Sequence, residues 1–309
     1  MTISRELIVD TLRGRVLRGM QAGTLTPGER LPTSRELASE FDVDYRLVIS
    51  AYKTLESEGL VELRPRGGVY VADVAASRSG TPPLPEGWLA DTLTEGLARE
   101  IPGPELHEWL RRGLETLRLR AVTITSTSDQ GLGLCRELRD DFGMEADALL
   151  VEEVRDAGTP PLPLRRADLV VSTAAHAEWL QTLANELKKP LIVIDVRPEL
   201  TGGEWALLLR RPVYAVVATV EFGEMLRRFY KDVPGIENLR VVVYGRDDVQ
   251  QIPAGAPTYV TQSVRARLGD ARIPGRILPA ARTIASESAR AIFSFILRSN
   301  IEAMSRVGR

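Results

Sequence analysis

The chain has 309 residues, of which 44% are hydrophobic and 27% are charged, as in ordinary soluble globular proteins. This length predicts at least two domains, because one hydrophobic core rarely extends so far. The net charge of -2 argues against a protein that binds polyanions through bulk positive charge. With a single cysteine, no apolar secretion segment and apolar runs too short to span a bilayer, we expect a cytoplasmic protein with no membrane contact.

The first part of the chain, residues 5–72, predicts three helices followed by a β-hairpin. Apolar residues recur at helical spacing over residues 5–19, which predicts the first helix. Thr33 or Ser34 is expected to cap a second helix from Arg35 to Phe41, because hydroxyl side chains accept hydrogen bonds from free amides at a helix start.

A third helix is expected after Asp44, which has the short acceptor side chain of an N-cap, and Gly59 ends it. Its predicted buried stripe consists of Val48, Ala51, Tyr52 and Leu55. Leu60 to Leu63 and Val69 to Val71 are β-like and are separated by a glycine-containing turn, so they predict a hairpin.

A helix-turn-helix with a hairpin beside it can place its last helix in a DNA major groove. The guanidinium of Arg46 matches the two acceptors of guanine, Ser50 can reach a base edge, and Lys53 suits a phosphate. The candidate DNA-binding residues are Ser34, Arg35, Tyr45, Arg46, Ser50, Lys53, Arg64, Arg66, Gly67 and Gly68. The alternative is that these arginines form a solvated surface, and residues 1–72 do contain ten basic and ten acidic side chains.

Three segments of this region resemble the GntR family of bacterial regulators, and they read LPTSRELA from Leu31, AYKTLESEGLV from Ala51 and GGVYV from Gly67. The Ala-Tyr pair is closest to the YtrA-like and MocR-like branches. The resemblance implies a winged-helix DNA reader, a homodimer on a pseudo-palindromic operator, and DNA contacts at Arg35, at the start of the third helix and at Gly68. Where the family usually has Ser-Arg, this chain has Asp44 and Tyr45, so its base contacts are expected to differ.

Residues 74–87 have the small, proline-rich composition of a linker, and helices are expected over 88–100 and 104–117. Their leucines either pair with a second protomer or pack within their own chain. We therefore divide the chain into a winged helix-turn-helix domain at 1–74, a linker and helix hairpin at 75–117, and an α/β effector-sensing domain at 118–309.

From residue 119 onward apolar strands alternate with helices, a pattern typical of α/β domains with a parallel sheet. The expected strands are 121–125, 148–154, 169–172, 191–195, 213–219, 239–244 and 258–260, and the expected helices are 130–142, 174–187, 220–230 and 284–304. A break over 198–204 suggests two lobes. Architecturally these halves resemble a periplasmic-binding-protein-like effector domain, also found in LysR regulators.

Ligands of such sheets bind at the carboxyl ends of the strands, where this chain carries hydroxyl and charged side chains. The candidate effector-binding residues are Ser126, Thr127, Ser128, Asp129, Ser172, Thr173, His176, Thr219 and Glu221. They suit a small polar or anionic effector, and the alternative is that the Ser and Thr residues only cap helices.

These observations predict a transcription regulator that binds an operator and a small effector, without catalytic site, cofactor or metal. Two histidines and one cysteine are too few for a usual structural zinc site, and Arg136 replaces the third glycine of a dinucleotide fingerprint. One alternative is an enzyme fused to a DNA-binding module, with Asp129, His176 and Glu221 as its acid–base groups. Another is a winged helix that contacts protein instead of DNA.

Overall fold

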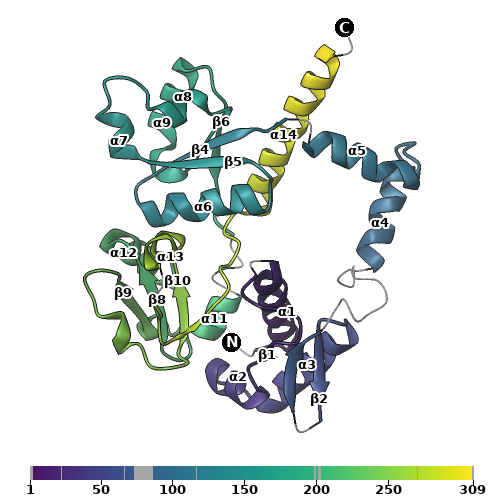
Figure 1. Ribbon diagram of the computed structural model, residues 1–309, viewed down its shortest axis with the longest axis vertical. Coiled ribbons are helices and arrows are strands. Elements are labelled where there is room, and N and C mark those ends of the chain that lie inside the picture. The colour runs from purple at the N-terminus through teal and green to yellow at the C-terminus, as the bar shows by residue number, and fades with distance from the viewer. Residues whose placement is uncertain are drawn as a thin grey trace. The chain divides into compact units, whose positions relative to one another are not determined.

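The computed structural model describes residues 3–21, 23–65, 67–72, 86–115, 117–197, 200, 203–269 and 271–307. Contacts divide the chain into two units, each assembled from separate segments (Figure 1). Unit 1 contains residues 1–85, 198–261 and 268–281, and unit 2 contains residues 86–197, 262–267 and 282–309. Most of the predicted linker and part of the predicted break at 198–204 lie outside the described residues.

The N-terminal part of unit 1 is a winged helix, as the sequence predicts. Its elements are α1 (Arg5–Gln21), β1 (Arg30–Leu31), α2 (Ser34–Phe41), α3 (Tyr45–Ser57), β2 (Val61–Arg64) and β3 (Gly68–Val71). The strands form an antiparallel sheet in the order β1-β3-β2, with Arg30 opposite Tyr70 and Val61 opposite Val71. All four residues of the predicted stripe on α3 are buried, so the opposite face of this helix is free to carry polar side chains.

The rest of unit 1 is a small α/β lobe, which we call the β8 lobe (residues 203–261 and 268–281). Its elements are α11 (Glu204–Leu208), β8 (Val213–Val217), α12 (Val220–Phe229), η2 (Ile236–Asn238), β9 (Leu239–Val243), η3 (Val249–Gln251), β10 (Pro257–Val260) and β11 (Arg276–Ile277). The parallel sheet has the order β11-β10-β8-β9. Buried Trp205 and Leu208 of α11 belong to the same hydrophobic cluster as Phe41 and Tyr52, so the β8 lobe packs on the winged helix.

Unit 2 contains a second parallel sheet, whose strand order is β5-β4-β6-β7 (Figure 1). Its elements are α4 (Glu86–Leu97), α5 (Gly103–Glu115), β4 (Arg120–Thr125), α6 (Ser128–Asp140), β5 (Glu145–Leu150), α7 (Val151–Arg155), α8 (Leu162–Arg166), β6 (Leu169–Thr173), η1 (Ala174–His176), α9 (Ala177–Glu186), β7 (Leu191–Ile194), α13 (Gln262–Leu268) and α14 (Ser286–Val307). Apolar side chains of α6 and α14 cover one face of the sheet, and those of α7, α8 and α9 cover the other.

The two sheets have the same connectivity, because in each the first strand lies between the second and the third. Buried β-branched and other aliphatic side chains fill the central strands, as expected for parallel sheets that are covered by helices. The C-terminal part is thus an α/β region of parallel sheets, as predicted. Among the described residues, no helix has both the length and the apolar character needed to cross a bilayer.

The expected strand over 148–154 is displaced along the chain: β5 begins three residues earlier and ends four residues earlier. β5 ends at Leu150, and Val151–Arg155 continues as the helix α7. The carboxylate of Glu153 accepts a hydrogen bond from the backbone N–H of Leu150 at 2.7 Å, which satisfies one free amide at the helix start. The apolar residues Val151 and Val154 could not distinguish a strand from a helix, because a buried apolar side chain suits either structure; both are buried here.

Candidate functional site

The start of α2 is fixed by a capping box that orients the exposed Arg35. Thr33 Oγ1 accepts a hydrogen bond from the backbone N–H of Glu36 at 3.2 Å, and Glu36 Oε2 accepts one from the N–H of Thr33 at 2.6 Å. The bond from the Thr33 backbone lowers the pKa of Glu36. Because Arg35 follows directly in this fixed turn and is exposed, its guanidinium can reach a partner in solution.

The start of α3 is fixed in a similar way, by Asp44. Its carboxylate accepts a hydrogen bond from the backbone N–H of Arg46 at 2.8 Å. Tyr45, Arg46 and Lys53 are exposed on this helix, and Ser50 is half-buried. The helix therefore presents one polar face that begins at its N-terminus, where a recognition helix contacts base edges.

The angle between α2 and α3 is held by the buried side chain of Tyr52. Its hydroxyl donates a hydrogen bond to the carbonyl oxygen of Pro32 at 2.6 Å, in the loop that precedes α2. Burial raises the pKa of Tyr52, so this hydroxyl remains a donor. This bond ties the third helix to the start of the second.

The hairpin of β2 and β3 carries Arg64 next to a tight turn. The guanidinium of Arg64 lies over the Tyr70 ring, 4.2 Å from its centroid, and pairs with Glu62 at 2.8 Å. Gly68 has φ 112°, a conformation that favours glycine, and a Cβ there would meet Arg30 Nε at 3.3 Å. The predicted contact Arg66 lies outside the described residues.

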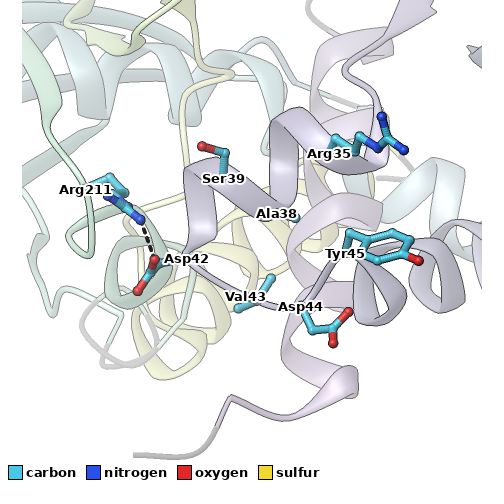
Figure 2. A pocket seen from close by; sticks show the side chains of 8 residues that line it. All are labelled: Arg35, Ala38, Ser39, Asp42, Val43, Asp44, Tyr45 and Arg211. Atoms are coloured by element: carbon cyan, nitrogen blue, oxygen red, sulfur yellow. Dashed lines mark hydrogen bonds and ion pairs between the residues drawn. The ribbon is translucent and has the colours of Figure 1, made fainter.

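Two surface hollows bring several of the predicted DNA contacts together. Ser34, Arg64 and Gly68 line a hollow of about 390 Å³ between the start of α2 and the hairpin. Arg35 and Tyr45 line another of about 520 Å³ along α2, which Figure 2 shows. Ser50 and Lys53 are not among the lining residues of either hollow. The surface formed by Arg35, Tyr45, Arg46, Lys53 and Arg64 is called the reading surface below.

Sequence reasoning missed an ionic cluster that joins the winged helix to the β8 lobe. Arg15 of α1 pairs with Glu40 of α2 at 2.8 Å and with Glu204 of α11 at 2.5 Å, and all three side chains are largely buried. Arg18 pairs with Glu204 at 2.7 Å, and Arg276 pairs with Glu40. Burial by itself would lower the pKa of Arg15, but Glu204 and Glu40 outweigh it and raise that pKa, so the guanidinium stays charged.

A second missed contact is exposed. Arg210 and Arg211, in the loop between α11 and β8, donate hydrogen bonds to the carboxylate of Asp42 at 3.2 and 2.6 Å. These bonds lower the pKa of Asp42. The sequence does show two adjacent arginines after a helix, but no neighbouring residue indicates that their partner is Asp42.

In unit 2, the carboxyl ends of β4 and β6 bring two candidate effector residues together. Ser126 Oγ and His176 Nε2 are 2.7 Å apart. Ser128 begins α6, Thr173 precedes η1, and Asp129 is buried. The exposed Ser126 and half-buried His176 thus form a polar pair at one edge of the sheet.

Other candidate effector residues take part in the internal hydrogen bonding of their own unit. Thr127 accepts from the backbone N–H of Gln130 at 3.3 Å, and Ser172 donates to the carbonyl of Ile124 at 2.6 Å. In unit 1, Thr219 accepts from the N–H of Phe222 at 3.3 Å and Glu221 is exposed. Thr127 and Thr219 therefore serve as helix caps, the role that the alternative reading assigns to them.

The N-terminal part of the chain is similar to known regulators. Residues 8–71 match the model described as bacterial regulatory proteins, gntR family. Over 65 residues the chain is 45% identical to the HTH-type transcriptional regulator Rv1152 of Mycobacterium tuberculosis, covering 21% of this chain and 54% of that protein. Over 108 residues it is 28% identical to the HTH-type transcriptional repressor YtrA of Bacillus subtilis, covering 34% of this chain and 80% of that protein.

Among solved structures, the GntR-family transcription factor YtrA from Sulfolobus acidocaldarius matches 36% of this chain and 87% of its own, with 26% identity and a TM-score of 0.25. The chain thus spans about half the length of the Mycobacterium tuberculosis relative. The quoted relatives from Mycobacterium tuberculosis and Bacillus subtilis are named as regulators of transcription. The winged helix is thus the part of the chain, residues 8–71, that matches the gntR family of bacterial regulatory proteins.

Proposed function

We propose that the protein is a transcription regulator that binds operator DNA through its winged helix. The observation that carries this proposal is the reading surface, in which exposed Arg35, Tyr45 and Arg46 stand at the starts of α2 and α3. Arg46 and Ser50 read base edges, while Ser34, Arg35 and Lys53 contact phosphates. Tyr45 contacts DNA at the head of α3, and the proposed contacts to the minor groove come from Arg64, Arg66, Gly67 and Gly68.

The proposal is tested by selecting bound sequences from random duplex DNA with the purified full chain. A defined motif is expected, and substituting Arg46→Ala should relax the preference at one position of that motif at a cost of about 1–3 kcal/mol. Recovery of random sequences by the unmodified protein would overturn the proposal and favour a winged helix that contacts protein.

The α/β region, residues 118–309 in our division of the chain, binds a small polar or anionic effector that changes operator affinity. The support is topological. In the order β5-β4-β6-β7 the chain turns to opposite sides of β4, so the carboxyl ends of β4 and β6 flank a topological switch point, where open α/β sheets bind ligands. Ser126 and His176 meet there.

In this proposal Ser126 and His176 contact the effector directly, while Thr127, Ser128 and Thr173 offer backbone amides at helix starts. Asp129 and Ser172 support them from the interior, and Thr219 and Glu221 occupy the corresponding strand end in the β8 lobe.

The effector site is tested by a thermal-shift screen of small carboxylates and phosphate esters, in which at least one compound should raise the unfolding midpoint of the unmodified chain. The rise should be absent in His176→Ala, and the stabilising compound should change operator affinity at fixed salt; no change in affinity would refute the regulatory coupling.

The protein acts as a homodimer in the cytoplasm, and the helices α5 and α14 of unit 2 supply the dimer surface. Trp109 and Leu110 of α5 are 61% and 51% exposed, and Ile301 of α14 is 56% exposed. Exposed apolar groups of this size are typical of interaction sites. A two-fold dimer matches two operator half-sites. Sedimentation should give a dimer for the unmodified chain and a monomer for Leu110→Glu; a monomeric unmodified chain would refute this part.

A further inference from the structure

One of the cationic side chains that line the hollow along α2, Arg211, belongs to the β8 lobe and not to the winged helix. Arg35 and Tyr45, two residues of the reading surface, line the hollow together with Asp42 and with Arg211 of the β8 lobe (Figure 2). Arg35 in the first turn of α2 and Asp42 at its C-cap are seven residues apart, so the hollow extends about 10 Å along that helix. One strand of duplex DNA advances about 3.4 Å of axis per phosphate, so this length corresponds to about three phosphates.

The arginine pair, Arg210 and Arg211, is held by a contact that an anion can replace. The side chains are 36% and 57% exposed, and that of Asp42 is 43% exposed. Ion pairs this exposed contribute little to stability, because water screens the charges. Because two guanidinium groups share one carboxylate, the group of three keeps a net positive charge, which suits a phosphate.

The position of the arginine pair is fixed relative to α2. The ionic cluster ties α11 to α1 and α2 through Arg15, Glu40 and Glu204, and Arg276 ties β11 to the same Glu40. These contacts are largely buried, and the loop with Arg210 and Arg211 follows α11 directly. The β8 lobe therefore presents its arginines beside the helix that carries Arg35.

We propose that Arg210 and Arg211 form a second phosphate-binding contact, which takes the DNA backbone that flanks the bases read by α3, and that Asp42 holds this pair until DNA replaces it. The inference rests on the proposed DNA-binding function. It supplies positive charge to a winged helix whose ten basic residues are matched by ten acidic ones. The partner is the phosphate backbone, so this contact adds affinity without sequence preference.

The test measures the affinity of the full chain for its selected operator as a function of salt. Arg210→Ala/Arg211→Ala is compared with Arg227→Ala/Arg228→Ala, an exposed arginine pair on α12 that removes the same charge from the same lobe but does not line the hollow. The first variant should bind about tenfold more weakly and lose about one to two from the log–log salt slope, and the control should keep both values. Asp42→Asn should bind more tightly than the unmodified chain.

Two results would overturn the inference: equal affinities for the two double variants, or tighter binding by Arg210→Ala/Arg211→Ala, which would mean that the pair shields the reading surface. If the proposed DNA-binding function is itself wrong, the unmodified chain will show no salt-dependent binding. That outcome can therefore be told apart from a failure of the inference about Arg210 and Arg211. Thermal midpoints of all variants, measured in parallel, separate a loss of the contact from a loss of fold.

Discussion

In the winged helix, the candidate contact side chains Arg35, Tyr45 and Arg46 are exposed, and a different set of residues forms the core. At the strand ends and the start of α6 in unit 2, the candidate side chains Thr127, Asp129 and Ser172 are buried, and two of them bond the backbone. The candidate residues of the winged helix are thus distinct from its core, whereas several candidate residues of unit 2 also hold its fold together. Substitutions should therefore separate function from stability at the exposed positions of the winged helix, and in unit 2 only at exposed positions such as Ser126.

The largest loss of stability is expected at the ionic cluster, which belongs to neither set. Substituting Glu204→Ala leaves the buried charge of Arg15 with Glu40 alone and should cost about 3–5 kcal/mol of the free energy of unfolding. Urea unfolding followed by circular dichroism measures the effect. The control is Glu224→Ala, an exposed position on α12, and equal midpoints for the two variants would show that the cluster does not stabilise unit 1.

The reading surface should show the opposite behaviour. Arg35→Ala should weaken DNA binding and reduce the log–log salt slope by about one, while the unfolding midpoint stays unchanged, because the side chain is exposed. Fluorescence anisotropy with labelled operator gives the affinity. Arg240→Ala, at an exposed position of β9, is the matched control. A lower unfolding midpoint for Arg35→Ala would contradict the prediction, because it would mean that this side chain also stabilises the winged helix.

In the sheet of unit 2, two neighbouring serines offer a sharper test. Ser172→Ala removes the buried donor to the Ile124 carbonyl and should lower stability by about 1 kcal/mol. Ser126→Ala, at an exposed position, should leave stability nearly unchanged and weaken only effector binding. Thermal unfolding of both variants, with and without the compound found by screening, gives the change in stability and the change in effector binding. The comparison of regions fails if Ser126→Ala is the more destabilised of the two.

The smallest effect concerns pH. Arg210 and Arg211 lower the pKa of Asp42, so its contribution to stability is present above the unfolded-state pKa of about 3.9 and is lost as the pH falls through the lowered value. The midpoints of Asp42→Asn and the unmodified chain should therefore differ near neutral pH and converge in acid. Asparagine is the suitable replacement because Asp42 has φ 53°, which asparagine tolerates. A difference that persists in acid would mean that the ion pairs are not its cause.

The sequence predicts the winged helix well because its signals are local. Thr33 and Glu36 form the capping box within one turn, and Asp44 caps α3 two residues from its partner. The two-residue strand β1 (Arg30–Leu31) was missed, since so short a segment has no periodicity, and its pairing with β3 comes from the fold.

The contacts between the winged helix and the β8 lobe could not be predicted in this way. Arg15 meets Glu204 across 189 positions of sequence, and Arg211 meets Asp42 across 169. Each is an ordinary charged residue by composition, and only the packing of α11 on the winged helix brings the partners together. In unit 2 the carboxyl ends of β4 and β6 were predicted to within one residue. Which hydroxyls are used as caps or internal donors depends on atomic positions, as at Thr127 and Ser172.

The proposed function of the winged helix is to bind specific DNA sequences. It is tested most directly by measuring the affinity of the full chain for its selected operator and for a shuffled duplex of the same composition, from low to moderate salt. We expect tighter binding to the operator at every salt concentration and a negative linear slope of log affinity against log salt for both duplexes. A slope near zero together with equal affinities would contradict it.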